Sequence, residues 1–188
     1  MIARAHRPAT DALRDAPLVP WLAQRVVSRS RSHTTLVVSA RQTGKTSVAA
    51  ALVLEVALGR PGTTSCVLCP TKQFLRRAVD KIVELSTNLG GVHWREQKGR
   101  FELDNGSTIE CVSAESAGGE ATRGLTIDGV LWIDEAALVP ENAARAARGC
   151  LLTGDGRVLV TTTPVGRNWV WREWNRDDAQ VMRVRFRA

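Results

Sequence analysis

A short segment of small and basic residues has the composition of a loop that binds phosphate; it reads Ser39-Ala40-Arg41-Gln42-Thr43-Gly44-Lys45-Thr46. The β-branched, apolar run 34–38 precedes it and predicts a buried strand, whereas Val48, Leu52 and Val56 follow at helical spacing. A helix attracts anions at its first turn, because the positive end of its dipole and its unpaired N–H groups lie there. The sequence therefore predicts an anion site between this strand and this helix.

The segment matches most of the phosphate-loop (Walker A) pattern, G-x-x-x-x-G-K-[ST], but Ser39 replaces the first glycine. We expect the backbone N–H groups of 42–46 to surround a β-phosphate. Lys45 would place its charge against the β- and γ-phosphates, and Thr46 would offer its hydroxyl to Mg²⁺. The alternative is a chance Gly-Lys-Thr after a strand, and a second motif argues against it.

Two carboxylates, Asp134 and Glu135, end the apolar run 130–133. Acidic side chains at the end of a buried strand are costly unless they have partners. In P-loop ATPases with an additional strand, the aspartate at this place holds the Mg²⁺ shell, and the glutamate after it polarises the attacking water. The alternative is a solvated pair of acids at a strand end.

A run of hydroxyl side chains, Thr161, Thr162 and Thr163, ends the next apolar segment and is followed by Pro164. At the end of a strand beside a nucleotide, such a run would sense the γ-phosphate and pass its loss to neighbouring segments. The same residues are also consistent with an ordinary β-branched strand that ends at a proline.

Strands and helices alternate along the chain, which predicts an α/β fold with a mainly parallel, doubly wound central sheet. The expected strands are 34–38, 64–69, 129–134, 157–162 and 181–187, with a hairpin over 101–113. Residues 114–124 are small and rich in glycine and predict a mobile loop. We expect a lead-in over 1–16 and one ATPase domain over 17–188.

The composition is that of a globular protein with an excess of positive charge. The chain has 188 residues, 44% of them hydrophobic, and a net charge of +7. Arginine supplies most of this charge, which indicates either a polyanionic partner or the codon bias of a GC-rich genome. No apolar run reaches the length of a membrane span, and the basic N-terminus lacks the apolar core of a secretory signal.

Two of the four cysteines, Cys66 and Cys69, form a C-x-x-C pair within the expected strand 64–69. Residues three apart in a strand point to opposite faces, which does not suit joint binding of zinc. We therefore expect small core residues in a reducing cytosol.

Together these motifs resemble the ATPase domain of phage terminase large subunits, the DNA-packaging motors of tailed phages. The resemblance rests on the Arg41-Gln42 pair with the lost first glycine, on the segment 121–125 (Ala-Thr-Arg-Gly-Leu), on 132–137 (Trp-Ile-Asp-Glu-Ala-Ala) and on the threonine run. The segment 69–73 is similar to one found in terminases and in superfamily 2 helicases. The most specific part is the Arg-Gln loop.

The resemblance implies an additional-strand, RecA-like P-loop NTPase that uses ATP and Mg²⁺ to move double-stranded DNA into a viral capsid. It implies a portal protein and a small terminase subunit as partners, and the bacterial host cytoplasm as the location. The active form would be a homo-oligomeric ring, and the isolated chain a monomer. DNA contact should be independent of sequence and sensitive to salt.

The resemblance also implies roles for single residues. Arg41 would contact phosphate, and Arg123 would be an arginine finger, acting within its own subunit or on a neighbour's site. Gln24 is placed like a glutamine that reads adenine, although Trp21 is an alternative that would stack on the base.

Two other functions remain open at this point. One is a helicase-like, nucleic-acid-dependent ATPase, which normally needs a second RecA-like domain. The other is a prophage remnant that binds nucleotide without turnover, against which Lys45, Asp134 and Glu135 argue. Complete terminase large subunits also carry an RNase H-like nuclease domain. Because the chain ends at residue 188, soon after Thr163, we expect no DNA cleavage by it.

Overall fold

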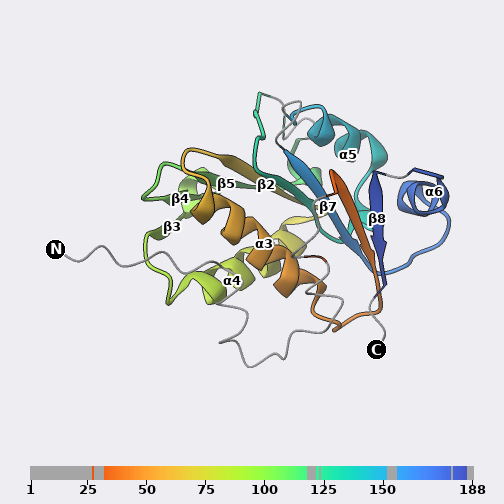
Figure 1. Cartoon of the computed structure of the whole chain (residues 1–188), viewed down its shortest axis with the longest axis horizontal. Coiled ribbons are helices and arrows are strands. Elements are labelled where there is room, and N and C mark those ends of the chain that lie inside the picture. The colour runs from red at the N-terminus through yellow and green to blue at the C-terminus, as the bar shows by residue number, and fades with distance from the viewer. Residues whose placement is uncertain are drawn as a thin grey trace.

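An eight-stranded mixed sheet forms the centre of the computed structural model, with the strand order β3-β4-β5-β2-β6-β7-β1-β8 (Figure 1). The strands are β1 Thr34–Val38, β2 Thr64–Cys69, β3 Val92–Arg95, β4 Arg100–Leu103, β5 Thr108–Ser113, β6 Val130–Ile133, β7 Arg157–Thr162 and β8 Val181–Val184. Among the described residues, the α-helices are α3 Lys45–Gly59, α4 Lys72–Ser86, α5 Glu141–Arg148 and α6 Trp169–Asn175. Short 3-10 helices in the same part of the chain are η1 Glu96–Lys98, η2 Ala114–Ala117 and η3 Ala136–Leu138.

The structure describes residues 27, 32–117, 122, 124–151, 156–178 and 180–185. The expected lead-in 1–16 therefore lies outside the described residues, as do Trp21, Gln24 and Arg123. Residues 118–121 and 123 of the loop predicted over 114–124 also lie outside them, and the first part of this loop is the helix η2.

The parallel part of the sheet has the strand order expected of an additional-strand P-loop fold. Strand β7 pairs in parallel with β6 on one side and with β1 on the other. It is thus inserted between the strand before the 39–46 loop and the strand before Asp134, and it is the additional strand of this group of P-loop folds. The predicted α/β class with a mainly parallel sheet is confirmed.

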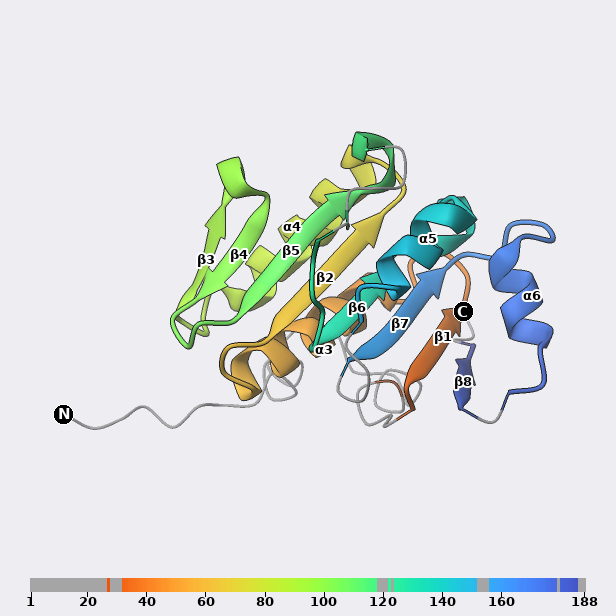
Figure 2. The same ribbon diagram turned by 90° about the horizontal axis from the view of Figure 1, so that it is seen from above.

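Helices cover both faces of the sheet, so that the molecule has three layers (Figure 2). Helices α3 and α4 pack on one face, and α5 and α6 on the other. Successive side chains of β6 point to opposite faces of the sheet. Trp132 packs in the core below α3, whereas Leu131 and Ile133 pack in the core below α5. Buried on two sides, this strand is apolar at every position.

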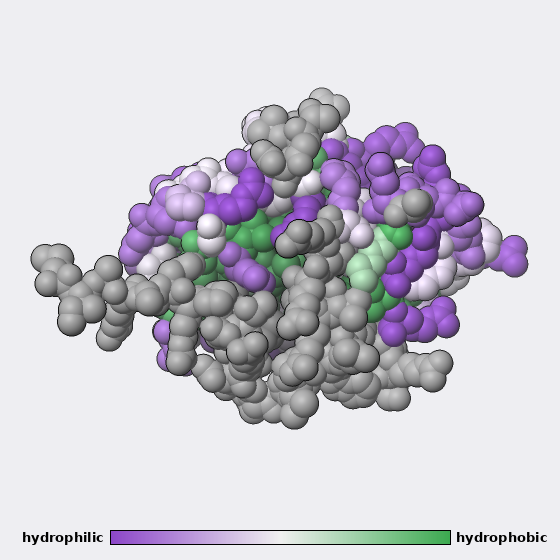
Figure 3. All heavy atoms as spheres, viewed as in Figure 1, coloured by the Kyte–Doolittle hydropathy of each residue, from purple (hydrophilic) through white to green (hydrophobic). Residues whose placement is uncertain are grey.

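Helix α3 is buried along nearly its whole length and is apolar around its circumference. Figure 3 shows apolar side chains near the middle of this face of the molecule, where Figure 1 has α3, with hydrophilic side chains above them and to the sides. Helix α3 packs into the core, and the loop before it is joined to the sheet by the hydrogen bond from Ser39 N–H to Thr162 O. Within the described residues, no helix is long and apolar enough to cross a membrane.

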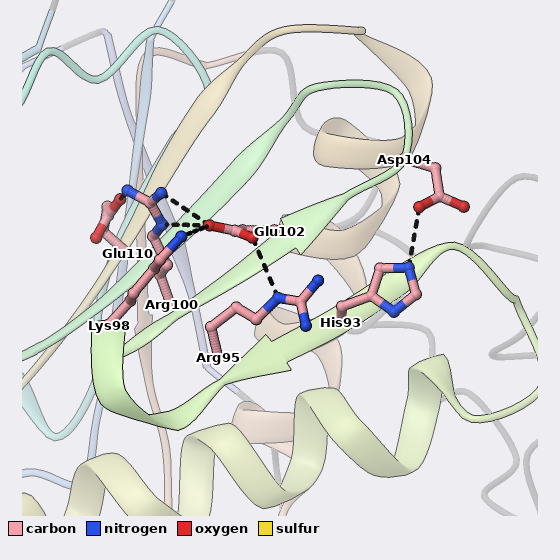
Figure 4. A network of polar contacts seen from close by, with 7 residues as sticks. All are labelled: His93, Arg95, Lys98, Arg100, Glu102, Asp104 and Glu110. Atoms are coloured by element: carbon pink, nitrogen blue, oxygen red, sulfur yellow. Dashed lines mark hydrogen bonds and ion pairs between the residues drawn. The ribbon is translucent and has the colours of Figure 1, made fainter.

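The sheet ends on one side in an antiparallel extension. The predicted hairpin is confirmed as β4 and β5, and β3 pairs antiparallel with β4. Strand β3 was not predicted, because its residues alternate between half-buried and exposed and include His93 and Arg95. On the outer face of this extension Glu102 accepts hydrogen bonds from Arg95, Lys98 and Arg100, as Figure 4 shows.

The edge strand β8 and the two cysteines of β2 bear on further predictions from the sequence. Strand β8 ends at Val184, and its last residue pairs with Val37, next to the last residue of β1. The predicted strand end at Arg187 lies outside the described residues. Cys66 and Cys69 lie in the two cores on opposite faces of the sheet, as the strand prediction requires.

Candidate nucleotide site

The carboxyl ends of three neighbouring parallel strands bring the predicted motifs to one edge of the sheet. Strands β6, β7 and β1 are adjacent, and they are followed by Asp134, Thr163 and the 39–46 loop, respectively. Backbone hydrogen bonds continue the sheet into these segments: Ser39 N–H donates to Thr162 O at 3.1 Å, and Asp134 N–H donates to Leu68 O at 2.9 Å. In open parallel sheets this edge is where ligands bind.

The 39–46 loop has the backbone of an anion-binding turn. Gly44 caps α3 with a φ of 81°, and Gln42 also has a positive φ of 59°. No side chain caps the helix and its first turn contains no acidic residue, so the helix itself offers no carboxylate to these N–H groups. Ser39 has no positive φ and continues the pairing with β7. This explains why the first glycine of the pattern can be replaced.

Lys45 lies at the centre of the site and is 6% exposed. Its Nζ donates to Ser39 O at 3.2 Å, to Ala40 O at 2.5 Å and to Thr163 Oγ1 at 3.5 Å. Burial lowers the pKa of Lys45, and the negative charges of Glu135 and Asp134 oppose that shift. The lysine therefore links the Walker A loop to the threonine run and lies in the field of both carboxylates.

Asp134 is buried, with 5% of its surface exposed. Its Oδ1 accepts a hydrogen bond of 2.6 Å from Thr161 Oγ1. Burial raises the pKa of Asp134 to about 6, and the Thr161 hydrogen bond and the charge of Lys45 act in the opposite direction. At neutral pH the side chain is thus a carboxylate whose negative charge is poorly solvated, which favours a cationic ligand.

Glu135 has left-handed backbone angles, with φ 45° and ψ 44°. Among the described residues, it and Gln42 are the two non-glycine residues with positive φ. Such conformations are unfavourable for residues other than glycine and concentrate at functional sites. Here one occurs in each half of the candidate site, and the Glu135 side chain is partly exposed beside the buried Asp134.

The three threonines of the run have different surroundings. Thr161 is fully buried and donates to Asp134. Thr162 is also buried, and its Oγ1 accepts from Ala137 N–H at 3.1 Å and donates to Thr163 O at 3.0 Å. Only Thr163 is partly exposed, and its hydroxyl contacts Lys45.

One buried side chain near the acids was not singled out from the sequence. Trp132 Nε1 donates to Thr161 Oγ1 at 2.7 Å, so that Trp132, Thr161 and Asp134 form one hydrogen-bonded chain. A tryptophan in an otherwise aliphatic buried strand is a signal, since its N–H needs an acceptor. The sequence does not say which acceptor that is.

The remaining predicted residues have simpler positions. Arg41 is exposed, and its charge lowers the pKa of Lys45. Thr43 Oγ1 donates to Ala40 O at 3.0 Å within the loop, and Thr46 is partly buried in the first turn of α3. Arg123 lies outside the described residues, but the neighbouring Thr122 accepts a contact of 3.0 Å from the Cys150 thiol at its backbone oxygen.

Comparison with known families identifies the chain. Residues 36–185 match the family model described as "Terminase large subunit, T4likevirus-type, N-terminal". The chain belongs to the terminase large subunit family. It is 28% identical over 171 residues to the terminase large subunit of Thermus phage G20c, and 27% identical to that of Thermus virus P23-45. Each alignment covers 81% of this chain and 35% of the relative, so the chain spans about a third of the length of these terminases.

Solved terminase structures have the same fold. The ATPase domain of the Thermus phage P74-26 large terminase superposes with a TM-score of 0.75 at 21% identity, covering 95% of this chain and 85% of that one. The large terminase of another thermophilic bacteriophage superposes with a TM-score of 0.79 at 16% identity, covering 90% and 46%. The same phage's terminase in complex with ADP gives a TM-score of 0.76 at 17% identity, covering 88% and 44%.

Proposed function

We propose that this terminase domain hydrolyses ATP with Mg²⁺ and couples hydrolysis to the movement of double-stranded DNA into a viral capsid. The observation that carries the proposal is the arrangement of Lys45, Asp134 and Glu135, in which the buried lysine lies in the field of both carboxylates at one sheet edge. Related terminase structures support it, since one is named as an ATPase domain and others hold ADP or ATP-γ-S.

The loop residues Ser39, Ala40, Arg41, Gln42, Thr43, Gly44, Lys45 and Thr46 would bind the nucleotide. Backbone N–H groups at the start of α3 would surround the β-phosphate, and the exposed Arg41 would add a guanidinium at its outer side. Lys45 has three N–H donors and three oxygen partners in the chain. Contact with phosphate would therefore replace one of these partners, and Thr163 is the most distant of them.

The donor set fits Mg²⁺ as P-loop enzymes bind it. The described residues contain no group of three or more His, Cys, Asp or Glu side chains for a metal, whereas Mg²⁺ usually uses one or two carboxylates together with substrate phosphates. Asp134 and Thr46 would supply the oxygens from the chain. Bound Mg²⁺ supplies positive charge that stabilises the γ-phosphoryl group during its transfer.

Glu135 would orient and polarise the attacking water. Its strained backbone turns the side chain out of the buried strand that precedes it, and the partly exposed carboxylate can accept a proton from water. Lys45 would stabilise charge on the phosphoryl oxygens from the opposite half of the site.

Thr163 would carry the nucleotide state to neighbouring segments. A γ-phosphate that draws Lys45 away from Thr163 would free the start of the segment 163–168. Thr161 and Thr162 would support this response from the core, since Thr162 ties the end of β7 to the backbone of η3 through Ala137. These contacts divide the coupling role between one responsive threonine and two anchoring ones.

The partners and the oligomeric ring extend this proposal to the whole motor. Double-stranded DNA, a portal protein and a small terminase subunit would be the partners, and Arg123 would complete the site within one subunit or from a neighbour. Mixing an Arg123→Ala chain with a Lys45→Ala chain separates the two modes of action. Recovery of ATPase activity in the mixture supports action on a neighbour, and no recovery under ring-forming conditions contradicts it.

The test of the ATPase proposal is the steady-state rate of ATP hydrolysis by the wild type and by Glu135→Gln in the presence of Mg²⁺. Loss of a general base typically reduces the rate about 10²–10⁴-fold. The control is Glu141→Gln, which changes a carboxylate that pairs with Arg145 at the start of α5 and should leave the rate unchanged. Equal rates for wild type and Glu135→Gln would remove Glu135 from the mechanism.

A further inference from the structure

Trp132 is the side chain from which this inference starts. It lies in the middle of β6 with none of its surface exposed, and it is the largest of the fully buried side chains in the described part of the chain. Trp132 and Asp134 are two residues apart and therefore point to the same face of the sheet. Thr161 on the neighbouring strand β7 meets both of them, because Trp132 pairs with Leu159, two residues before Thr161.

The direction of the hydrogen bonds along this chain follows from the chemistry of the groups. An indole N–H can only donate, so Thr161 Oγ1 must accept the bond of 2.7 Å from Trp132. The single hydroxyl proton of Thr161 then points to an acceptor, and Asp134 Oδ1 at 2.6 Å is much closer than Ile133 O at 3.5 Å. The chain therefore runs from Trp132 through Thr161 to Asp134.

Such a chain fixes an acidic side chain more firmly than one hydrogen bond does. All three side chains are buried, and in a low-dielectric interior each bond polarises the next. The Trp132 N–H holds the threonine oxygen in place and withdraws electron density from it, so that its O–H is a better donor to the carboxylate. The two hydrogen bonds also join side chains of β6 and β7 to each other next to the carboxyl ends of these strands.

We propose that Trp132 is a positioning residue for Asp134, and that it acts through Thr161. The proposal rests on the proposed function in one respect, namely that Asp134 supplies an oxygen to Mg²⁺ with bound nucleotide. Trp132 itself touches neither. Its effect is to keep the Asp134 carboxylate in one rotamer, with one oxygen engaged by Thr161.

The test is a double-mutant cycle on the 188-residue chain with Trp132→Phe, Thr161→Val and the combined variant. The first readout is the Mg²⁺ concentration that half-saturates binding of ATP-γ-S, which does not require turnover. Loss of one hydrogen bond in a series that ends on a carboxylate changes a binding constant by roughly tenfold. We expect the Mg²⁺ midpoint to rise about three- to tenfold in each single variant, and no further in the combined variant.

Trp169→Phe is the matched control, because Trp169 is also buried and its Nε1 donates to Val139 O at 3.0 Å. It loses the same kind of bond without a link to Asp134, so its Mg²⁺ midpoint should equal that of the wild type. Thr161→Ser keeps the hydroxyl and should also bind like the wild type. The second readout is kcat of the Trp132→Phe and Thr161→Val variants, which should fall in parallel with their Mg²⁺ binding. Their KM for ATP at saturating Mg²⁺ should change little.

A second variant covers the case in which Trp132→Phe does not fold. Replacing Trp132 by 3-benzothienylalanine puts sulfur in place of the indole N–H and keeps the shape of the ring system. We expect the same rise in the Mg²⁺ midpoint from this analogue. Wild-type Mg²⁺ binding in the analogue, or fully additive effects of the 132 and 161 changes, would overturn the proposal. A wild-type chain that binds Mg²⁺ and ATP-γ-S without hydrolysing ATP would contradict the proposed function alone.

Discussion

Two carboxylates in this terminase domain accept hydrogen bonds from neighbouring side chains, yet their surroundings have opposite effects on their charge. Asp134 at the end of β6 is buried, and its pKa is raised to about 6 by that burial. Glu102 on the antiparallel extension is partly exposed, and hydrogen bonds from Lys98, Arg100 and Arg95 lower its pKa to about 2 (Figure 4). Burial thus outweighs the hydrogen bond at Asp134, while three cationic donors dominate at Glu102.

The two carboxylates differ in how far neighbouring groups balance their negative charge. The negative charge of Glu102 is matched within the extension, and its partners are at least one-third exposed. Exposed ion pairs of this kind contribute little to stability. Asp134 has a hydroxyl donor and a nearby lysine, and its charge remains under-solvated at neutral pH. A bound cation would relieve that condition.

The largest expected difference between the two carboxylates is in catalysis. Asp134→Asn should reduce the rate of ATP hydrolysis at least about 10²-fold, because it removes the charge that would face Mg²⁺ and phosphate in the proposed site. Glu102→Gln should leave the rate within about twofold of the wild type. Both rates are measured with saturating ATP and Mg²⁺. Loss of activity in both variants would mean that the extension also takes part in the reaction.

The next largest difference is in stability without ligands. At pH 7 wild-type Asp134 is ionised in the fold at a cost, so Asp134→Asn should raise the free energy of unfolding by about 1–3 kcal/mol. The native state binds this proton more tightly than the unfolded chain does. The gain should therefore be complete above pH 6 and disappear as the pH falls toward 3.8, the ordinary pKa of an aspartate. Urea unfolding of both chains at several pH values measures it, and a destabilised Asp134→Asn would contradict the burial argument.

The smallest effect is expected for the exposed cluster. Glu102→Gln should lower the unfolding midpoint slightly at low ionic strength, and added salt should reduce the difference. Because the pKa of Glu102 is lowered in the fold, its contribution is present above pH 4.5 and is lost as the pH falls through about 2. Thermal unfolding at two salt concentrations checks this. A large, salt-independent loss would show that Glu102 acts as a core residue.

The sequence predicts the parallel part of the fold well and the extension less well. Strands 34–38, 64–69 and 157–162 were predicted at their observed ends, because apolar runs buried on two faces give a strong signal. Strand β3 was missed because its exposed side chains interrupt any such pattern. It is formed by pairing with β4, which is a tertiary effect that the local sequence does not encode.

The candidate site could be predicted as a set of residues but not as a set of contacts. The loop, the two acids and the threonine run were all found from their types and spacing, and the strand order β6-β7-β1 brings them to one edge. The sequence alone does not distinguish the surroundings of Thr161, Thr162 and Thr163. The pleat of β7 turns Thr162 to the face opposite Thr161, which lies beside Asp134, whereas Thr163 follows the end of the strand and contacts Lys45. The part played by Trp132 depends on the register between β6 and β7, which local patterns do not contain.

We propose that the ends of β1, β6 and β7 form one nucleotide site with Lys45 at its centre. Calorimetric titration of ATP-γ-S with Mg²⁺ into wild type and Lys45→Ala tests it most directly, with urea unfolding to verify that both chains are folded. We expect Lys45→Ala to weaken binding by about 10²-fold, since a charged partner of the phosphates is lost. Equal affinity in two folded chains would contradict it.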